Sequence, residues 1–451
     1  MKKNLLQTMA RPLAAVALAT TLVGAPVDSS ELQELRNQIR ELEAKLVQLE
    51  RRQEIQVERV AVTDKGVTVA SADGANSVKI RGLIQLDSRL FFNDGGGISN
   101  NAFVLRRARL ITEGTFAKNF GYQLVTEFGG SSVSIQDANF TVALSKALTF
   151  KFGKFKSPIG LEQLQSDSWT FFNERSIVTN LVPNRDLGVQ ASGDVFGGAL
   201  NYTVGVFGGL GDGGSTTNTD FDNEKDVVAR VIATPFKGDA DSPVQGLSIG
   251  IAGSSGREKT ASGRTNGYRT DGQQTFFSYN ATTVADGRNW RISPQFDYRL
   301  GSFGALGEYV VSTINVRSGA AGAKTELQNK AWQFAAGYVL TGEKSSYAGV
   351  VPKTNFDWAA GTWGAFEVSV RYANLRVDDA AFPAFASAAS TADEAKSFGL
   401  GLNWYLAKAV AFKIDTYRTK FGFSPLAPAI PTTQILRQDE QALITRFQLS
   451  F

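Results

Sequence analysis

The sequence predicts an all-β protein: a 16-stranded antiparallel transmembrane β-barrel preceded by a short N-terminal α-helical coiled coil. Apolar and polar residues alternate in sixteen segments between residues 78 and 451, which is the period of a strand with two different faces. Short turns and long loops rich in Gly, Ser, Asn and Asp separate these segments. No stretch of about 18 uninterrupted apolar residues offers a helical span, so a membrane-crossing chain of this kind must be a closed barrel.

The first 25 residues have the three parts of a secretory signal peptide. Lys2, Lys3 and Arg11 form its positive region, residues 13–23 form a short apolar run, and Val23-Gly24-Ala25 supplies the small-residue end. A membrane anchor is the alternative, but an anchor needs about 20 apolar residues to cross the hydrocarbon core. We therefore expect residues 1–25 to be removed on export, which lowers the formal charge from +4 to +1.

Residues 28–60 are predicted to form a periplasmic coiled coil. Six apolar residues recur at alternating spacings of three and four and so share one seam of a helix. They are Leu32, Leu35, Ile39, Leu42, Leu46 and Leu49. Three heptads are marginal in isolation, so we expect other chains to hold the helix in place. The alternative is a single amphipathic helix packed on its own domain.

Residues 61–77 are predicted to be a linker, and residues 78–451 the barrel domain. The sixteen predicted strands are residues 78–92, 103–116, 120–129, 133–144, 147–156, 187–196, 198–209, 225–236, 245–254, 288–300, 303–317, 329–341, 363–377, 396–407, 409–421 and 441–451. Aromatic residues end many apolar faces, as in interfacial girdles, and full charges lie mid-strand on the opposite face. A soluble β-sandwich also alternates, but the alternating short and long connections favour a barrel.

The even number of strands places both ends of the barrel in the periplasm. The last strand ends in Phe451 and resembles the recognition signal of bacterial outer-membrane barrels. Both features agree with an exported protein of the outer membrane.

The chain contains no histidine and no cysteine. This composition removes Ser-His-Asp and Cys-His catalysis, His/Cys zinc sites, disulfides and haem attachment. We expect no metal, no cofactor and no enzymatic activity, although carboxylate pairs such as Glu367 with Asp415 leave a barrel enzyme as an alternative. The pI near 9.0 invites a nucleic-acid partner, but export and the lack of a dense Lys/Arg run argue against one.

Five motifs resemble the phosphate- and polyphosphate-selective porins, the porin O and P family. They are RRARL at 106–110, FGKFKSPIGLE at 152–162, FFNERS at 171–176, LGEY at 306–309 and YVLTGE at 338–343. The resemblance spans residues 78–451 and implies a sixteen-stranded homotrimeric porin that passes anions. It also implies that residues 157–186 form an inward-folded constriction loop, with Lys154, Lys156 and Arg175 as its anion contacts.

Strand parity places twelve basic and eight acidic side chains on the lumen face, a modest preference for anions. The predicted pore-lining and anion-binding residues are Arg81, Arg89, Arg107, Arg109, Lys151, Lys154, Lys156, Arg175, Arg291 and Arg371. Arg185 is a weaker candidate near the loop exit. In the alternative, Arg175 pairs with Glu174 or Glu162 and holds the loop to the wall, since buried charges are usually paired.

These observations predict a water-filled outer-membrane channel for passive diffusion of small hydrophilic solutes, biased towards anions such as phosphate. The expected partners are the lipid bilayer, lipopolysaccharide, small anions and two further copies of the chain. If the wall charges pair with one another, the channel is instead a general, non-selective porin, and its coiled coil would also tether the outer membrane to the cell wall.

Overall fold

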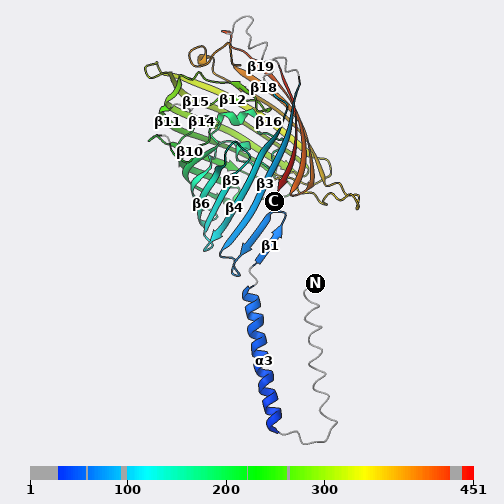
Figure 1. Ribbon diagram of the computed structural model, residues 1–451. Helices are drawn as coiled ribbons and strands as arrows, with labels where there is room; N and C mark the ends of the chain where they lie inside the picture. Colours follow the sequence, from blue (N-terminus) through cyan, green and yellow to red (C-terminus); the bar gives the residue numbers. More distant parts are fainter. Residues whose placement is uncertain (1–28, 57–58, 93–98, 221, 262–264, 427–438) are drawn as a thin grey trace. The chain divides into compact units, whose positions relative to one another are not determined.

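The computed structural model describes residues 29–56, 59–92, 99–220, 222–261, 265–426 and 439–451 (Figure 1). The chain divides into two compact units, residues 1–58 and residues 59–451, and each is described by itself. The predicted signal peptide, residues 1–25, lies outside the described residues.

The first unit contains one helix of 28 residues, α3 (Ser29–Gln56). Leu, Glu, Gln and Arg dominate its sequence, and all four have high helix propensity. The six seam residues are 45–63% exposed in the single chain. The helix predicted here is thus confirmed, and its apolar seam is exposed within the described residues of this unit. Neither α3 nor any other described helix is long and apolar enough to span a membrane.

The second unit is a closed antiparallel barrel of sixteen strands (Figure 1). The strands are β3 (Ser77–Phe92), β4 (Ala102–Phe116), β5 (Phe120–Glu127), β6 (Ser134–Ser145), β7 (Leu148–Lys156), β8 (Arg185–Val195), β9 (Leu200–Phe207), β10 (Asp226–Ala233), β11 (Leu247–Ala261), β14 (Thr283–Leu300), β15 (Phe303–Ser318), β16 (Thr325–Val339), β17 (Ala365–Arg376), β18 (Glu394–Ala407), β19 (Val410–Gly422) and β20 (Glu440–Ser450). Each pairs with its sequence neighbours in the barrel, and β20 closes the ring on β3. All sixteen predicted strands are present.

A hairpin precedes the barrel. Its strands β1 (Arg59–Thr63) and β2 (Gly66–Ala70) pair with each other, and β2 continues the sheet along the first residues of β3. Residues 61–77, which the sequence analysis assigned to a linker, therefore contain most of this hairpin. Its valines alternate and favour a strand. Gly66 permits the turn because its φ is +100° and a Cβ would lie 2.1 Å from the Ile80 carbonyl oxygen.

The two faces of the wall differ as the alternation predicts. Outward side chains such as Phe103 and Phe140 are exposed apolar groups, and the Phe140 ring stacks on Phe152 at 4.9 Å. Inward side chains include the buried charges Arg446 and Asp415. We call the rim that carries the turns at 117–119, 301–302 and 408–409 the periplasmic rim, after the side that the sequence predicts for its short turns.

Several connections contain short elements of their own. These are α4 (Leu161–Leu164), η2 (Ile177–Leu181), η3 (Phe196–Gly198), η4 (Asp379–Ala381) and a separate two-stranded sheet of β12 (Tyr268–Arg269) and β13 (Thr275–Phe277). One connection on the periplasmic rim, residues 340–364, is also long.

Candidate functional site

Residues 157–184, between β7 and β8, fold into the barrel, where most of their side chains are buried. The far wall holds this loop by its backbone carbonyls. Lys413 donates to the Thr170 carbonyl at 2.7 Å, and Asn403 donates to the Phe171 carbonyl at 2.9 Å. The loop runs from wall to wall through these contacts, and the inward position predicted for residues 157–186 agrees with them. We call residues 157–184 the constriction loop.

Two arginines predicted to contact anions lie instead against loops. Arg371 donates to the Glu174 carbonyl at 3.0 Å and to the Asp271 carboxylate at 2.8 Å. Arg291 donates to the Asp212 carboxylate at 3.0 Å and to the Leu210 carbonyl at 2.8 Å. Their exposed fractions are 1% and 3%. Both face the lumen, as parity requires, but loops lie in front of them.

Asp167 of the constriction loop forms ion pairs with three arginines. Its carboxylate lies 3.2 Å from Arg107 and forms ion pairs with Arg109 and Arg175. Burial opposes the charged form, but the charges of Arg107, Arg175 and Arg109 outweigh it and hold the pKa of Asp167 well below its usual range. Asp167 is therefore ionised across the physiological pH range.

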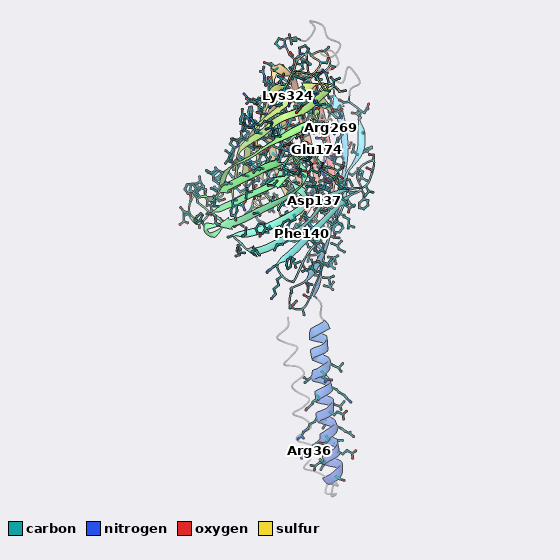
Figure 2. The ribbon with its side chains drawn as sticks, turned by 90° about the vertical axis from the view of Figure 1, so that its left-hand side faces the viewer. Arg36, Asp137, Phe140, Glu174, Arg269 and Lys324 are labelled. Atoms are coloured by element: carbon teal, nitrogen blue, oxygen red, sulfur yellow. The ribbon has the colours of Figure 1, made fainter. Side chains whose placement is uncertain are left out.

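Glu174 of the constriction loop forms ion pairs with a second set of three arginines. Its carboxylate lies 2.6 Å from Arg106, 2.9 Å from Arg446 and 3.2 Å from Arg89. Burial again opposes ionisation, but Arg106 and Arg446 hold the pKa of Glu174 well below its usual range. Figure 2 shows Arg269, Glu174 and Asp137 following one another along the barrel.

Two β-bulges shape the wall beside the loop. In β4, Leu105 pairs with Leu86 and Arg107 pairs with Gln85, so Arg106 is the extra residue. In β6, Ile135 pairs with Thr126 and Asp137 pairs with Val125, which makes Gln136 the extra residue. A bulge redirects side chains locally. Consecutive residues Arg106 and Arg107 consequently both reach carboxylates of the constriction loop.

Three cavities follow one another through the barrel. The outer cavity has a volume of about 670 Å³, the middle cavity about 130 Å³ and the inner cavity about 720 Å³. Arg109, Asp167 and Arg185 line both the outer and the middle cavity. Arg81, Trp169 and Ser450 line both the middle and the inner cavity. The shared residues mark a path from the constriction loop to the periplasmic rim.

Lys and Arg side chains outnumber Asp and Glu side chains in the described lining of each of these three cavities. The outer cavity has Arg106, Arg107, Arg109, Arg175, Arg185 and Arg269 against Glu127, Asp167 and Glu174. The middle cavity has Arg81, Arg109, Lys156 and Arg185 against Asp137 and Asp167. The inner cavity has Lys65, Lys79, Arg81, Lys344, Lys353 and Lys408 against Asp64 and Glu343.

Five of the ten predicted contact residues line these cavities: Arg81, Arg107, Arg109, Lys156 and Arg175. The other predicted residues of the strands have partners elsewhere. Arg89 pairs with Asp87 and Glu174, the Lys154 ammonium donates to the Thr217 carbonyl, and Lys151 lies 5.3 Å from the centre of the Phe155 ring.

Arg175 holds the constriction loop together as well as lining the outer cavity. It donates to the Glu162 carbonyl at 2.8 Å and to the Gln165 carbonyl at 2.6 Å, besides its ion pair with Asp167. The alternative prediction pairs Arg175 with the carboxylate of Glu174 or Glu162. Its carboxylate partner is instead Asp167, which lies seven positions from Glu174 and five from Glu162.

Parity missed Arg106, because a bulge is invisible to a strict two-residue period. Arg269 lies on β12, inside a segment that the sequence showed only as a long loop. The inner cavity adds lysines from the hairpin turn and from residues 340–364. That long periplasmic connection reaches the constriction loop, since the Gln165 amide donates to the Tyr347 carbonyl at 2.9 Å.

Comparison with known proteins agrees with this architecture. Residues 78–420 match the family described as phosphate-selective porin O and P. Porin O of Pseudomonas aeruginosa is 26% identical over 396 residues, which cover 80% of this chain and 87% of that protein.

Solved outer-membrane proteins share the fold. The channel DcaP of Acinetobacter baumannii superposes with a TM-score of 0.52 and 11% identity, covering 84% of this chain and 98% of that one. A loop-deletion variant of OmpT of Vibrio cholerae superposes with a TM-score of 0.51 and 12% identity, covering 84% and 100%.

Proposed function

This chain belongs to the phosphate-selective porin O and P family and forms a solute channel of the bacterial outer membrane, and from that premise we propose that it is a homotrimeric diffusion porin biased towards anions of the phosphate type. The observation that carries the proposal is the cationic excess in the outer, middle and inner cavities. An anion that enters from outside meets a positive lining at each stage, which favours its entry over that of a cation.

Pairing within the wall supports passage rather than tight capture. Arg109 is shared between Glu127, at 2.6 Å, and Asp167, and Arg185 lies 3.0 Å from Asp137. A phosphate oxygen competes with these carboxylates for the guanidinium groups, so each contact is weakened. Conduction requires sites that an ion can leave as readily as it enters.

The proposed trimer accounts for the exposed seam of α3. Three copies of the helix would bury Leu32, Leu35, Ile39 and their seam neighbours against one another as a coiled coil. A trimeric barrel would bring the three short helices close together and offset the cost of nucleating each. The OmpT structure described as a trimer form shares the fold, with a TM-score of 0.50.

The apolar outer face of the barrel suits the hydrocarbon core of the bilayer, and its long-loop rim would contact lipopolysaccharide in the outer leaflet. We further propose that residues 1–25 are the export signal and that the mature chain begins after them.

Reversal potentials in planar bilayers under a KCl gradient test the anion bias, and phosphate titration of the chloride current tests the phosphate preference. We expect an anion-selective potential and a current that phosphate reduces. Arg109→Ala should weaken the phosphate block about tenfold, as loss of a charge-assisted hydrogen bond does.

Arg376→Ala is the matched control, because Arg376 is an exposed arginine that lines none of the three cavities. A cation-selective potential in the wild-type protein would overturn the anion bias. An Arg109→Ala channel that phosphate blocks as strongly as the wild type would overturn the role of the constriction.

A further inference from the structure

Trp169 stands at the exit of the constriction. It belongs to the constriction loop, two residues after Asp167, and it is the only aromatic residue in the described lining shared by the middle and inner cavities. It is partly buried against the apolar cluster that contains Val339, Val350 and Tyr405. A solute that leaves the middle cavity therefore passes an indole ring.

The long periplasmic connection holds that ring in place. Gly349 lies so close that a Cβ there would be 2.2 Å from Trp169 Cε3 and 2.3 Å from Cδ2. Only glycine fits this approach, and the φ of +101° at Gly349 also favours glycine. The backbone of residues 340–364 thus covers one side of the indole.

Cations lie on the same two cavities as the ring. Arg81 lines both cavities. One of its terminal nitrogens lies 2.9 Å from the Glu113 carboxylate. The Nε of Arg81 has no hydrogen-bond partner in the described part of the chain. Lys156 lies on the middle cavity, and Lys79 lies on the inner one. The inner cavity measures about 720 Å³, several times the cavity of about 150 Å³ that is known to hold one benzene ring.

We propose that Trp169 and Arg81 form a binding site for planar aromatic anions, in which the ring of the solute packs on the indole while its carboxylate or phosphate group meets Arg81. The inference rests on the proposed anion channel and names a class of organic solute for it. Aromatic pairs gain stability beyond their buried area, and that gain distinguishes a flat ring from a saturated one of similar size and equal charge.

Block of the chloride current by benzoate and by cyclohexanecarboxylate tests the proposal, with each probe added from either side of a planar bilayer. In the wild-type channel we expect benzoate to block about two- to tenfold more strongly than cyclohexanecarboxylate. Trp169→Leu should bring this ratio close to one while inorganic phosphate blocks as before. Arg81→Gln should weaken both organic anions together and leave their ratio unchanged.

Trp358→Leu is the matched control, since Trp358 lies on the same periplasmic connection but is 77% exposed and lines none of the three cavities. Trp169→Phe, which keeps a smaller ring, should retain part of the ratio if Trp169→Leu does not fold. Equal block by benzoate and cyclohexanecarboxylate in the wild type, or an unchanged preference for benzoate in Trp169→Leu, would overturn the aromatic site. The reversal potential separates the two proposals. A channel that is anion-selective but is blocked equally by benzoate and cyclohexanecarboxylate would refute only the aromatic site.

Discussion

Arg446 on β20 and Asp87 on β3 form a two-fold hydrogen-bonded ion pair across the seam where the barrel closes. Nε lies 2.6 Å from Oδ1 and Nη2 lies 2.8 Å from Oδ2, and the two residues are direct register partners. Their side chains are 1% and 0% exposed. Arg446 also donates to the Glu174 carboxylate at 2.9 Å, so the closing seam and the constriction loop share one guanidinium group.

Arg446→Gln should lower the thermal stability of the folded barrel. The substitution removes the two-fold hydrogen-bonded partner of the buried Asp87 and leaves Arg89, at 3.2 Å, as its remaining cation, so the cost lies below the about 3–5 kcal/mol of a fully broken buried pair. The measurement is the temperature at which the protein loses the fast electrophoretic migration of a folded barrel. Arg418→Gln is the control, because Arg418 and Asp439 form an exposed pair (56% and 39%) of the kind worth about 0–1 kcal/mol. Equal losses in both variants would contradict a special role for the seam.

Asp167→Asn should make the channel more selective for anions. The substitution removes a negative charge shared by the outer and middle cavities and leaves Arg107, Arg109 and Arg175 without their common partner. We expect the reversal potential in a KCl gradient to move towards the chloride limit. Asp379→Asn, an exposed change on η4, is the control and should leave the potential as in the wild type. A shift towards cations would show that Asp167 acts on selectivity through loop position instead of charge.

The Asp167 and Glu174 carboxylates of the constriction loop should stay ionised well below neutral pH. The pKa values of Asp167 and Glu174 are depressed in the folded state, so their contribution to stability is fully present above about pH 4–4.5, where unfolded carboxyls titrate, and is lost as the pH falls through the lower folded values. Asp167 should therefore stay ionised from pH 7 to about pH 5, and the difference in reversal potential between the wild type and Asp167→Asn should be the same at both pH values. A difference that disappears at pH 5 would mean that Asp167 is protonated there.

Ile39→Asp in α3 should reduce the fraction of trimer that survives in detergent. A charge on the seam would be buried in the proposed coiled coil, and the helix is too short to associate without its apolar face. Native electrophoresis of the purified protein measures the trimer fraction. Asn37→Asp is the control, because Asn37 lies outside the seam on the same helix. An unchanged trimer fraction in Ile39→Asp would argue that the barrels associate without the helix.

The strand pattern was predictable because alternation is a local property. A residue in a wall between lipid and lumen must suit one or the other, so Arg371, Lys413 and Asp415 could each be placed on the inner face from their neighbours alone. The apolar seam of the helix was predictable because it too is a local pattern, which repeats every three or four residues instead of every two. The local pattern of residues 61–77 predicts a linker and not the hairpin, because two five-residue strands are too short to show a clear alternation.

Burial of the inward charges was decided by contacts between distant segments. Parity treats Arg371 and Arg109 alike, yet Asp271 and the Glu174 carbonyl cover Arg371, whereas Arg109 stays on the outer cavity. A bulge turned Arg106 towards Glu174, and a periplasmic connection placed Gly349 against Trp169. Away from the β-bulges, the sequence alone determined which face of the wall each charge occupies, because that depends on one strand. Only the tertiary structure decided which charges a solute can reach, because that depends on loops from other strands that fill the lumen.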